Sequence, residues 1–270
     1  MIFCDDGTTY YFYSNVASNQ TIPHIDPSKP SILMLHGFSA DKDIWLKLAR
    51  YAYKDYQLII PDFKGHGAHL YHSRENYSAM AQAEYINHLL SVLYPVKSTQ
   101  LLIVGNSMGG MVAAILGQIN DCVTKLVLLD PAGAKSDFAR ILAEKKHNPF
   151  LHDTVESAKS FFKNTMYKPP FVPPSVLHYL IHKNYLSKSN QYKHMFTDFF
   201  DIDSFFSKPF TPSEKYPPSL IVWGEKDALL PASDAVIWQK LVNGKMVILP
   251  NIGHMPMVEC PKQVFKLLKF

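Results

Sequence analysis

The sequence predicts an α/β protein with a mostly parallel central sheet. Short apolar runs, of the kind that form strands buried on both faces of such a sheet, recur along the chain. Segments with helical spacing of apolar residues separate these runs, and alternation of strand and helix is typical of the α/β class. Several runs end directly in a turn signal, as at His36-Gly37, Pro61-Asp62 and Asp130-Pro131.

The expected elements follow one another in a regular order. An N-terminal hairpin is predicted over 1–15, followed by a proline-containing loop over 19–30. Strands are predicted at 32–35, 57–60, 101–104, 126–129, 220–223 and 246–249. Helices are predicted at 44–53, 76–94, 111–119, 235–241 and from 263 to the C-terminus.

The order is interrupted between Gly133 and Tyr216. This stretch lacks apolar strand runs, contains Pro169-Pro170 and Pro173-Pro174, and otherwise favours helices. We therefore expect a core formed by 1–133 and 216–270, with a helical insert at 134–215 over one end of the sheet.

Length and composition exclude several classes of protein. A chain of 270 residues can bury enough surface to fold without a disulfide or a metal. With 47% hydrophobic and 19% charged residues, it is neither disordered nor a coiled coil. The net charge of +4 is mild and the lysines are scattered, so no nucleic-acid partner is expected.

The cysteines and the N-terminus bear on the compartment. Cys4, Cys122 and Cys260 are odd in number and form no zinc-like spacing, so free thiols in a reducing compartment are expected. The first residues lack a basic region followed by an apolar stretch, and no apolar run reaches the roughly 18 residues of a membrane span. We expect a cytoplasmic protein, with peripheral membrane contact left open.

Ser107 lies in the strongest motif of the chain. The predicted strand 101–104 leads into Gly105-Asn106-Ser107-Met108-Gly109, and a helix follows. This is the G-x-S-x-G pattern in its required context, where a strained turn raises the serine hydroxyl above the sheet edge. Strand and helix then approach so closely that the flanking positions need small residues. The motif predicts a serine nucleophile.

A serine nucleophile needs a histidine base that is oriented by a carboxylate. His254 follows the predicted strand 246–249, and Asp227 follows the strand 220–223. Both therefore lie beyond the carboxyl ends of strands, where open parallel sheets bind ligands. We favour Asp227 as the acid, although Glu225 shares its turn and Asp130, after another strand, is the main rival.

An oxyanion hole needs two N–H donors. The helix that follows Ser107 offers the N–H of Met108, which has no partner within the helix. The loop after strand 32–35 offers that of Phe38, since Gly37 permits the backbone to turn. We expect Met108 and Phe38 to be these donors.

Several segments together resemble the α/β-hydrolase family over nearly the whole chain. They are HGF at 36–38, PDFKGHG at 61–67, GNSMGG at 105–110, WGEKDALLP at 223–231 and GHMPMVECP at 253–261. HGFSADKDIW at 36–45, GNSMGG and DPAG at 130–133 look most like the branch that contains monoacylglycerol lipases and related carboxylesterases.

The resemblance implies a catalytic triad of Ser107, Asp227 and His254, with Phe38 and Met108 as oxyanion donors. It also implies a helical lid at roughly 134–215 and the hydrolysis of a small-molecule ester or lipid. No metal or organic cofactor is expected. The sequence does not indicate an oligomeric state.

Other classes of function compete with this interpretation. The second candidate is a hydrolase of C–C bonds in ring-cleavage products, or an esterase acting on a carrier-bound acyl chain, with the same triad. The C–C branch shares GNSMGG but typically has a bulky aromatic after its histidine, where this chain has Met255-Pro256. A noncatalytic binding protein is disfavoured because the triad is intact, and a dehalogenase would need Asp in place of Ser107.

Aromatic residues are concentrated in the predicted lid. Residues 150–216 hold 15 of the 35 aromatic side chains, including adjacent pairs at 161–162, 199–200 and 205–206. Adjacent residues point in different directions around a helix, so these pairs cannot all form a core. The pattern favours an apolar pocket for medium or long acyl chains. The lid lysines are interpreted as solvated helix faces rather than a site for an anionic surface or an acyl carrier (Lys145, Lys146, Lys159, Lys163, Lys168).

Overall fold

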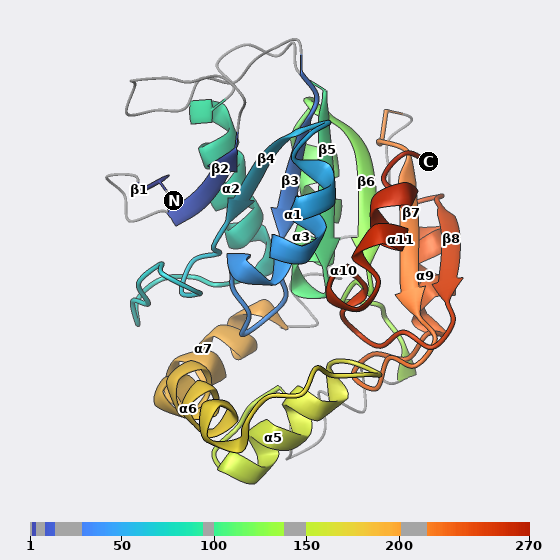
Figure 1. The fold of residues 1–270 in the computed structure, drawn as a ribbon. Coiled ribbons are helices and arrows are strands. Elements are labelled where there is room, and N and C mark those ends of the chain that lie inside the picture. Colours follow the sequence, from blue (N-terminus) through green and yellow to red (C-terminus); the bar gives the residue numbers. More distant parts are fainter. Residues whose placement is uncertain (1, 4–8, 14–28, 94–99, 138–149, 201–214) are drawn as a thin grey trace.

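The protein has a central sheet of eight strands in the order β1-β2-β4-β3-β5-β6-β7-β8 (Figure 1). The structure, a computed structural model, describes residues 2–3, 9–13, 29–93, 100–137, 150–200 and 215–270. The strands are β1 (Ile2–Phe3), β2 (Thr9–Tyr13), β3 (Ser31–Leu35), β4 (Gln57–Pro61), β5 (Leu101–Asn106), β6 (Val123–Leu129), β7 (Ser219–Gly224) and β8 (Lys245–Leu249).

Six of these strands, from β4 to β8 in the sheet order, are parallel to their neighbours. The register aligns Leu33 with Ile59 and with Ile103, so the three central strands end together. β1 and β2 add an antiparallel edge, which confirms the predicted N-terminal hairpin, although its turn at 4–8 lies outside the described residues.

Helices cover both faces of the sheet (Figure 1). Successive residues of β3 alternate between the two cores, because Leu33 and Leu35 pack on one face and Ile32 and Met34 on the other. Helices α2 (Ala79–Leu93), α3 (Met108–Ile119) and α9 (Asp234–Leu241) cover the first face. The second face is covered by the 3₁₀ turn η1 (Lys42–Trp45) and helices α1 (Leu46–Ala52), α10 (Pro256–Glu259) and α11 (Pro261–Leu267).

All strands predicted for the parallel sheet are present, and the helices differ from prediction mainly at their ends. The helix expected at 111–119 begins at Met108, directly after Ser107. The segment expected at 44–53 divides into η1 and α1. α10 was not predicted, because four residues between two prolines are too few to show helical periodicity.

The predicted lid contains helices α5 (Val155–Asn164), α6 (Pro174–Asn184) and α7 (Ser189–Phe199), with the short turn η2 (Leu186–Lys188). These helices form a separate layer beyond the end of the sheet toward which the parallel strands point (Figure 1). Residues 138–149 and 201–214 lie outside the described part, so the lid boundaries at 134 and 215, and the pair Phe205-Phe206, stay predictions.

Two further observations concern the compartment. Cys122 and Cys260 are free thiols, and Cys4 is not among the described residues. In the part of the chain that the structure describes, no helix combines the length and apolar character that a membrane crossing needs.

Candidate active site

Ser107 occupies the sharp turn between β5 and α3. Its backbone has φ 54° and ψ −117°, a strained conformation for a residue with a side chain. A Cβ on Gly105 would lie 2.1 Å from the carbonyl oxygen of Gly109, and one on Gly109 would lie 2.2 Å from that of Leu35. The crowding inferred from the motif is therefore present, and it admits only glycine at these two positions.

Backbone hydrogen bonds hold this turn against the neighbouring strand. The N–H of Ser107 donates to the carbonyl of Leu129 at 2.9 Å, and its own carbonyl accepts from Ala132 at 3.0 Å. The serine side chain is nearly buried and faces the cavity between core and lid. These contacts fix the main chain at Ser107 and therefore the point from which its side chain projects.

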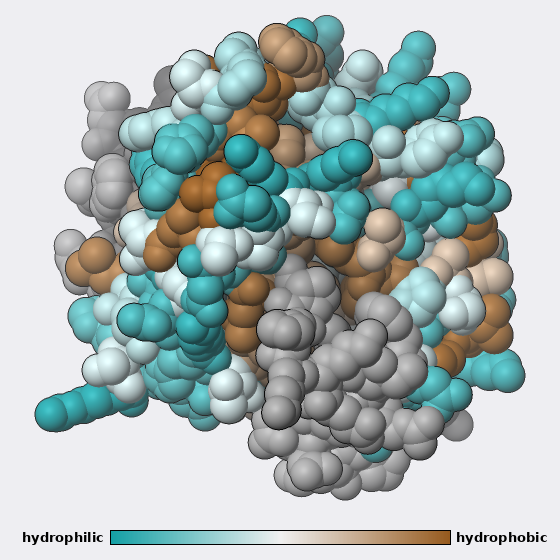
Figure 2. Space-filling view, turned by 90° about the horizontal axis from the view of Figure 1, so that it is seen from below, coloured by the Kyte–Doolittle hydropathy of each residue, from teal (hydrophilic) through white to brown (hydrophobic). Residues whose placement is uncertain are grey.

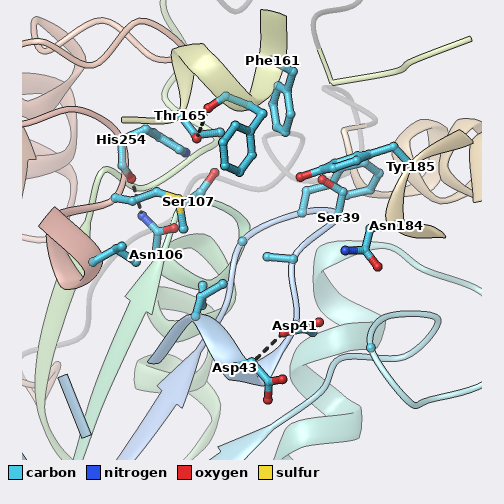
Figure 3. Close-up of a pocket in the computed structure, with 18 of the residues that line it drawn as sticks. Ser39, Asp41, Asp43, Asn106, Ser107, Phe161, Thr165, Asn184, Tyr185 and His254 are labelled. Atoms are coloured by element: carbon cyan, nitrogen blue, oxygen red, sulfur yellow. Dashed lines mark hydrogen bonds between the residues drawn. The ribbon is translucent and has the colours of Figure 1, made fainter. Parts of the chain in front are cut away.

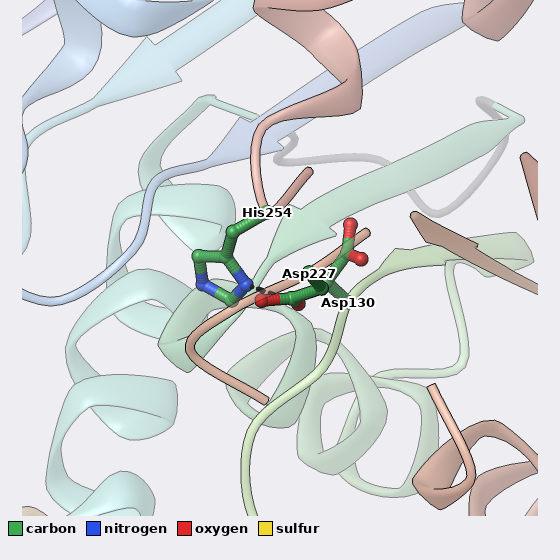
Figure 4. A group of neighbouring side chains, drawn as sticks. All are labelled: Asp130, Asp227 and His254. Atoms are coloured by element: carbon green, nitrogen blue, oxygen red, sulfur yellow. Dashed lines mark hydrogen bonds and ion pairs between the residues drawn. The ribbon is translucent and has the colours of Figure 1, made fainter. Parts of the chain in front are cut away.

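His254 and Asp227 meet at the end of the sheet. Nδ1 of His254 lies 2.6 Å from Oδ2 of Asp227 (Figure 4). The other oxygen of Asp227 accepts the N–H groups of Leu229 and Leu230 at 2.8 and 3.0 Å, which orients the carboxylate. Ser107 and His254 line the same cavity (Figure 3). The structure therefore pairs His254 with Asp227 and places Ser107 on the same cavity as His254, and the role of these three side chains as a catalytic triad stays a prediction.

Asp130, the rival acid, is completely buried beside Asp227 (Figure 4). Its Oδ1 accepts the N–H of Gly224 at 2.7 Å. Burial, and next the negative charge of Asp227, raise the pKa of Asp130 well above its usual range. A carboxyl whose ionisation is opposed in this way is a weaker partner for a charged imidazole than Asp227, which bonds Nδ1 of His254 directly. Glu225 instead accepts the N–H of Asn251, on the loop that leads to His254, at 3.1 Å.

Asp130, Asp227 and His254 each offer an atom that could bind a metal ion, all within 4.8 Å of one another. Nδ1 of His254 is engaged with Asp227, and Asp130 accepts a backbone N–H group. Hydrogen bonding accounts for this group of side chains.

Both predicted oxyanion donors, Phe38 and Met108, lie close to Ser107. A Cβ on Gly37 would be only 3.3 Å from Cβ of Ser107, so the loop that carries Phe38 passes directly beside the serine. Met108 is the first residue of α3, where N–H groups have no partner within the helix. The ring of Phe38 points toward the lid and lies 5.5 Å from that of Tyr192.

A buried ion pair that sequence reasoning missed stabilises the Phe38 loop. Lys42 donates to the fully buried carboxylate of Asp62 twice, from Nζ at 2.5 Å and from its backbone N–H at 2.9 Å. Ala68 donates a third bond to this carboxylate, and a Cβ on Gly67 would lie 2.3 Å from it. Asp62 belongs to the PDFKGHG motif, but no local pattern marks Lys42, 20 residues earlier, as its partner.

The cavity above Ser107 has a volume of about 720 Å³, within the range of small-molecule sites. Its apolar wall comes mainly from the lid and is formed by Phe150, Phe161, Phe162, Met166 and Leu229. Its polar side is formed by Ser39, Asp41, Asp43, Asn184 and Tyr185 (Figure 3). Burial, with the negative Asp41 as a lesser cause, raises the pKa of Tyr185 to about 12, so its hydroxyl stays a donor. One cavity thus offers both apolar and polar surface near the serine.

A serine on a strained strand–helix turn, with a histidine and an aspartate at the same sheet edge, is the arrangement of a serine hydrolase. The chain belongs to the alpha/beta hydrolase family, whose model matches residues 32–267.

Two relatives are similar to this chain over more than four fifths of its length. Monoacylglycerol lipase ABHD6 of Mus musculus is 29% identical over 252 residues, which cover 89% of this chain and 74% of the relative. Lipase 3 of Moraxella sp. (strain TA144) is 29% identical over 236 residues, covering 86% and 73%. Among solved structures, a membrane phospholipase A described as a bacterial virulence factor superposes with a TM-score of 0.78 at 24% identity, over 98% of this chain and 85% of that one. That likeness shows the fold.

Proposed function

We propose that this protein hydrolyses carboxylic esters with medium or long acyl chains, of the monoacylglycerol or simple carboxylester type. The observation that carries the proposal is the Nδ1–Oδ2 hydrogen bond between His254 and Asp227, in a cavity that Ser107 shares and that aromatic lid residues cover. The names of the relatives, a monoacylglycerol lipase and a lipase, agree with this substrate class.

The reaction follows from the positions of these groups. With Nδ1 bonded to Asp227, Nε2 of His254 takes the Ser107 proton as the hydroxyl oxygen attacks the ester carbonyl. The N–H groups of Phe38 and Met108 stabilise the oxyanion. His254 then gives the proton to the departing alcohol, and water, activated by the same histidine, releases the acid from the acyl-enzyme. One ester and one water yield one acid and one alcohol.

The cavity supports a substrate with two unlike ends. An acyl chain would contact the wall that includes Phe161, Phe162 and Leu229, and each buried methylene contributes about 0.8 kcal/mol. An alcohol with further hydroxyl groups would meet Asp41 and the neutral Tyr185 on the polar side. A monoacylglycerol has both features.

A substrate panel tests this proposal. Nitrophenyl esters from acetate to palmitate and monoacylglycerols are assayed with the wild type and with Ser107→Ala, which should lose about 10⁶ in kcat if the triad acts as a unit. Strict preference for acetate, or substantial turnover by the variant, would reject the proposal. Turnover of a ring-cleavage dienoate but no ester would instead identify a C–C hydrolase, and turnover of acyl-carrier thioesters alone a carrier-specific enzyme.

We also infer that the lid contacts lipid surfaces from outside. Phe171 is 88% exposed and Tyr179 60% exposed on the described lid, with Lys168 and Lys183 exposed beside them in the chain. Hydrophobic and hydrophilic residues lie interspersed on the face of the molecule where the lid helices are found (Figure 2). Exposed aromatic rings suit a lipid interface, and exposed lysines add attraction to anionic lipid, which replaces the solvated-face interpretation given above for Lys168.

Vesicle binding tests this contact. Co-sedimentation with vesicles of anionic lipid should exceed that with neutral vesicles and should fall in Phe171→Ser, with hydrolysis of soluble esters unchanged. Equal, weak binding to both vesicle types would remove membrane contact from the proposal and leave the esterase assignment standing.

A further inference from the structure

The carboxylate of Glu259 joins the lid to the loop that carries His254. Its Oε1 accepts the N–H of Gly253 at 2.9 Å. Its Oε2 accepts the N–H groups of Tyr167 and Lys168, just beyond α5 in the lid, at 2.9 and 3.3 Å. Glu259 is the last residue of α10, which packs with the core. One core side chain therefore binds both segments.

The two segments also contact each other directly. The backbone N–H of His254 donates to the carbonyl of Thr165 at 3.0 Å. A Cβ on Gly253 would lie 2.5 Å from the backbone nitrogen of Tyr167 and 2.9 Å from Met166. Residues 165–168 are therefore in direct backbone-to-backbone contact with the His254 loop.

His254 is consequently held at three points. The core supplies two, through Asp227 at Nδ1 and through Asn106, whose Nδ2 donates to the His254 carbonyl at 3.0 Å. The lid supplies the third through Thr165. Loss of the Glu259 bonds would leave this third contact supported by one hydrogen bond. Small displacements of a catalytic group can cost up to about a hundredfold in rate.

We propose that Glu259 is a positioning residue that fixes lid residues 165–168 against the His254 loop, so that this end of the lid is a permanent part of the active site. The proposal rests on the esterase function proposed above. It means that movement at the end of α5 changes the rate of the chemical step, while access for substrate depends on other parts of the lid. Glu259 itself acts through Gly253 and residues 165–168 and does not line the cavity.

The test compares Glu259→Ala and Glu259→Gln with a matched control. Glu225→Ala removes another glutamate that accepts an N–H from the same loop, at Asn251, but that bonds to no lid residue among those described. For each variant, kcat and KM are measured on a soluble ester, and the rate of covalent labelling by a small fluorophosphonate is measured separately. Thermal unfolding establishes that each variant is folded.

The expected result is a fall of about tenfold in both kcat and labelling rate for Glu259→Ala, with KM within about twofold. Glu259→Gln keeps one acceptor oxygen, so its kcat and labelling rate should fall by about threefold. This variant still tests the proposal if the alanine variant does not fold. Glu225→Ala should match the wild type.

Other outcomes would overturn the proposal. A rise in KM with unchanged kcat and labelling would show that Glu259 shapes the substrate pocket only, and no change in any quantity would show that the bridge has no role. An equal loss of kcat and labelling rate in Glu225→Ala would show that the loss of any hydrogen bond to the His254 loop lowers the rate, with no special role for the lid contact. Failure of the proposed function is distinguishable, because the wild type itself would then hydrolyse no ester, whereas its labelling rate at Ser107 could still be compared with those of the variants.

Discussion

Around Ser107 the backbone leaves no space for side chains, whereas above Ser107 the lid consists of large aromatic side chains. Gly105 and Gly109 each face a carbonyl oxygen at a distance that no Cβ could occupy. In the lid, the rings of Phe150 and Phe161 lie 5.9 Å apart, and those of Phe196 and Phe200 are stacked at 4.2 Å. Backbone crowding admits one residue type, while aromatic packing tolerates many combinations of similar volume. The position of the nucleophile is therefore constrained by backbone crowding, whereas the shape of the substrate pocket depends on the packing of lid side chains.

The largest expected effect concerns the carboxylate that orients His254, at the end of the central sheet. Asp227→Asn keeps the shape of the side chain but removes the charge that orients His254, so kcat should fall by about 10⁴. Asp130→Asn is nearly isosteric and leaves the hydrogen bond between Asp227 and His254 in place, so it should change kcat by less than about tenfold. Steady-state kinetics on one soluble ester measures both. The reverse ranking would assign the role of the acid to Asp130.

A smaller effect is expected in the lid. Phe161→Ala removes a nearly buried ring from the apolar wall, worth about 1.5–3 kcal/mol, so kcat/KM for long-chain esters should fall by about tenfold to a hundredfold. The rate on acetate esters should stay within about twofold. Phe171→Ser, on the exposed side of the lid, is the matched control and should alter neither rate. A uniform loss across all chain lengths would mean that Phe161 supports the fold and not the acyl chain.

The smallest effect concerns His66, where the core meets the lid. This buried ring lies 5.5 Å from that of Phe38 and 6.0 Å from that of Tyr192. Burial, and next the nearby His36, lower the pKa of His66 to about 3. Because the unfolded chain binds this proton near pH 6.5, His66 costs no stability above that pH and destabilises the fold progressively as the pH falls toward 3.

Urea unfolding at pH 7.5 and pH 5.0 measures this contribution. Between these values the wild type should lose about 2 kcal/mol more than His66→Asn, in which the amide can replace the ring at the carbonyl of Lys64. Each protein is compared with itself at the two pH values, so a loss of packing that does not depend on pH cancels. An identical pH dependence in both proteins would contradict the assignment.

The sequence predicted the core well because its signals are local. Four-residue apolar runs predict strands wherever both faces are buried, and Gly105-Asn106-Ser107-Met108-Gly109 carries its own geometric requirement. The position of His254 after a strand placed it at the correct sheet edge. Preference for Asp227 over Asp130 was weaker, because both follow strands. Only the spatial arrangement shows which carboxylate reaches Nδ1 of His254.

Long-range partners were not predictable in this way. Lys42 and Asp62 are 20 residues apart and Glu259 and Tyr167 are 92 apart, and no periodic pattern links either pair. The sequence also does not show which lid aromatics line the cavity. Phe161 lines the cavity and also belongs to the core cluster, whereas Phe199 belongs to that cluster and does not line the cavity. This difference depends on tertiary packing rather than on the spacing of the pairs.

The contact of residues 165–168 with the His254 loop also divides the lid into two segments of chain. α5 precedes the contact, while α6, η2 and α7 follow it. A change in length or sequence after residue 168 therefore does not alter the spacing between the contact and α5. α7, by contrast, is bound to the core, because the N–H of Tyr77 donates to Asp198 at 3.0 Å and the ring of Phe38 lies 5.5 Å from that of Tyr192. For protein engineering, we therefore expect lid segments from relatives to be tolerated at α6, with residues 165–168 and α7 retained.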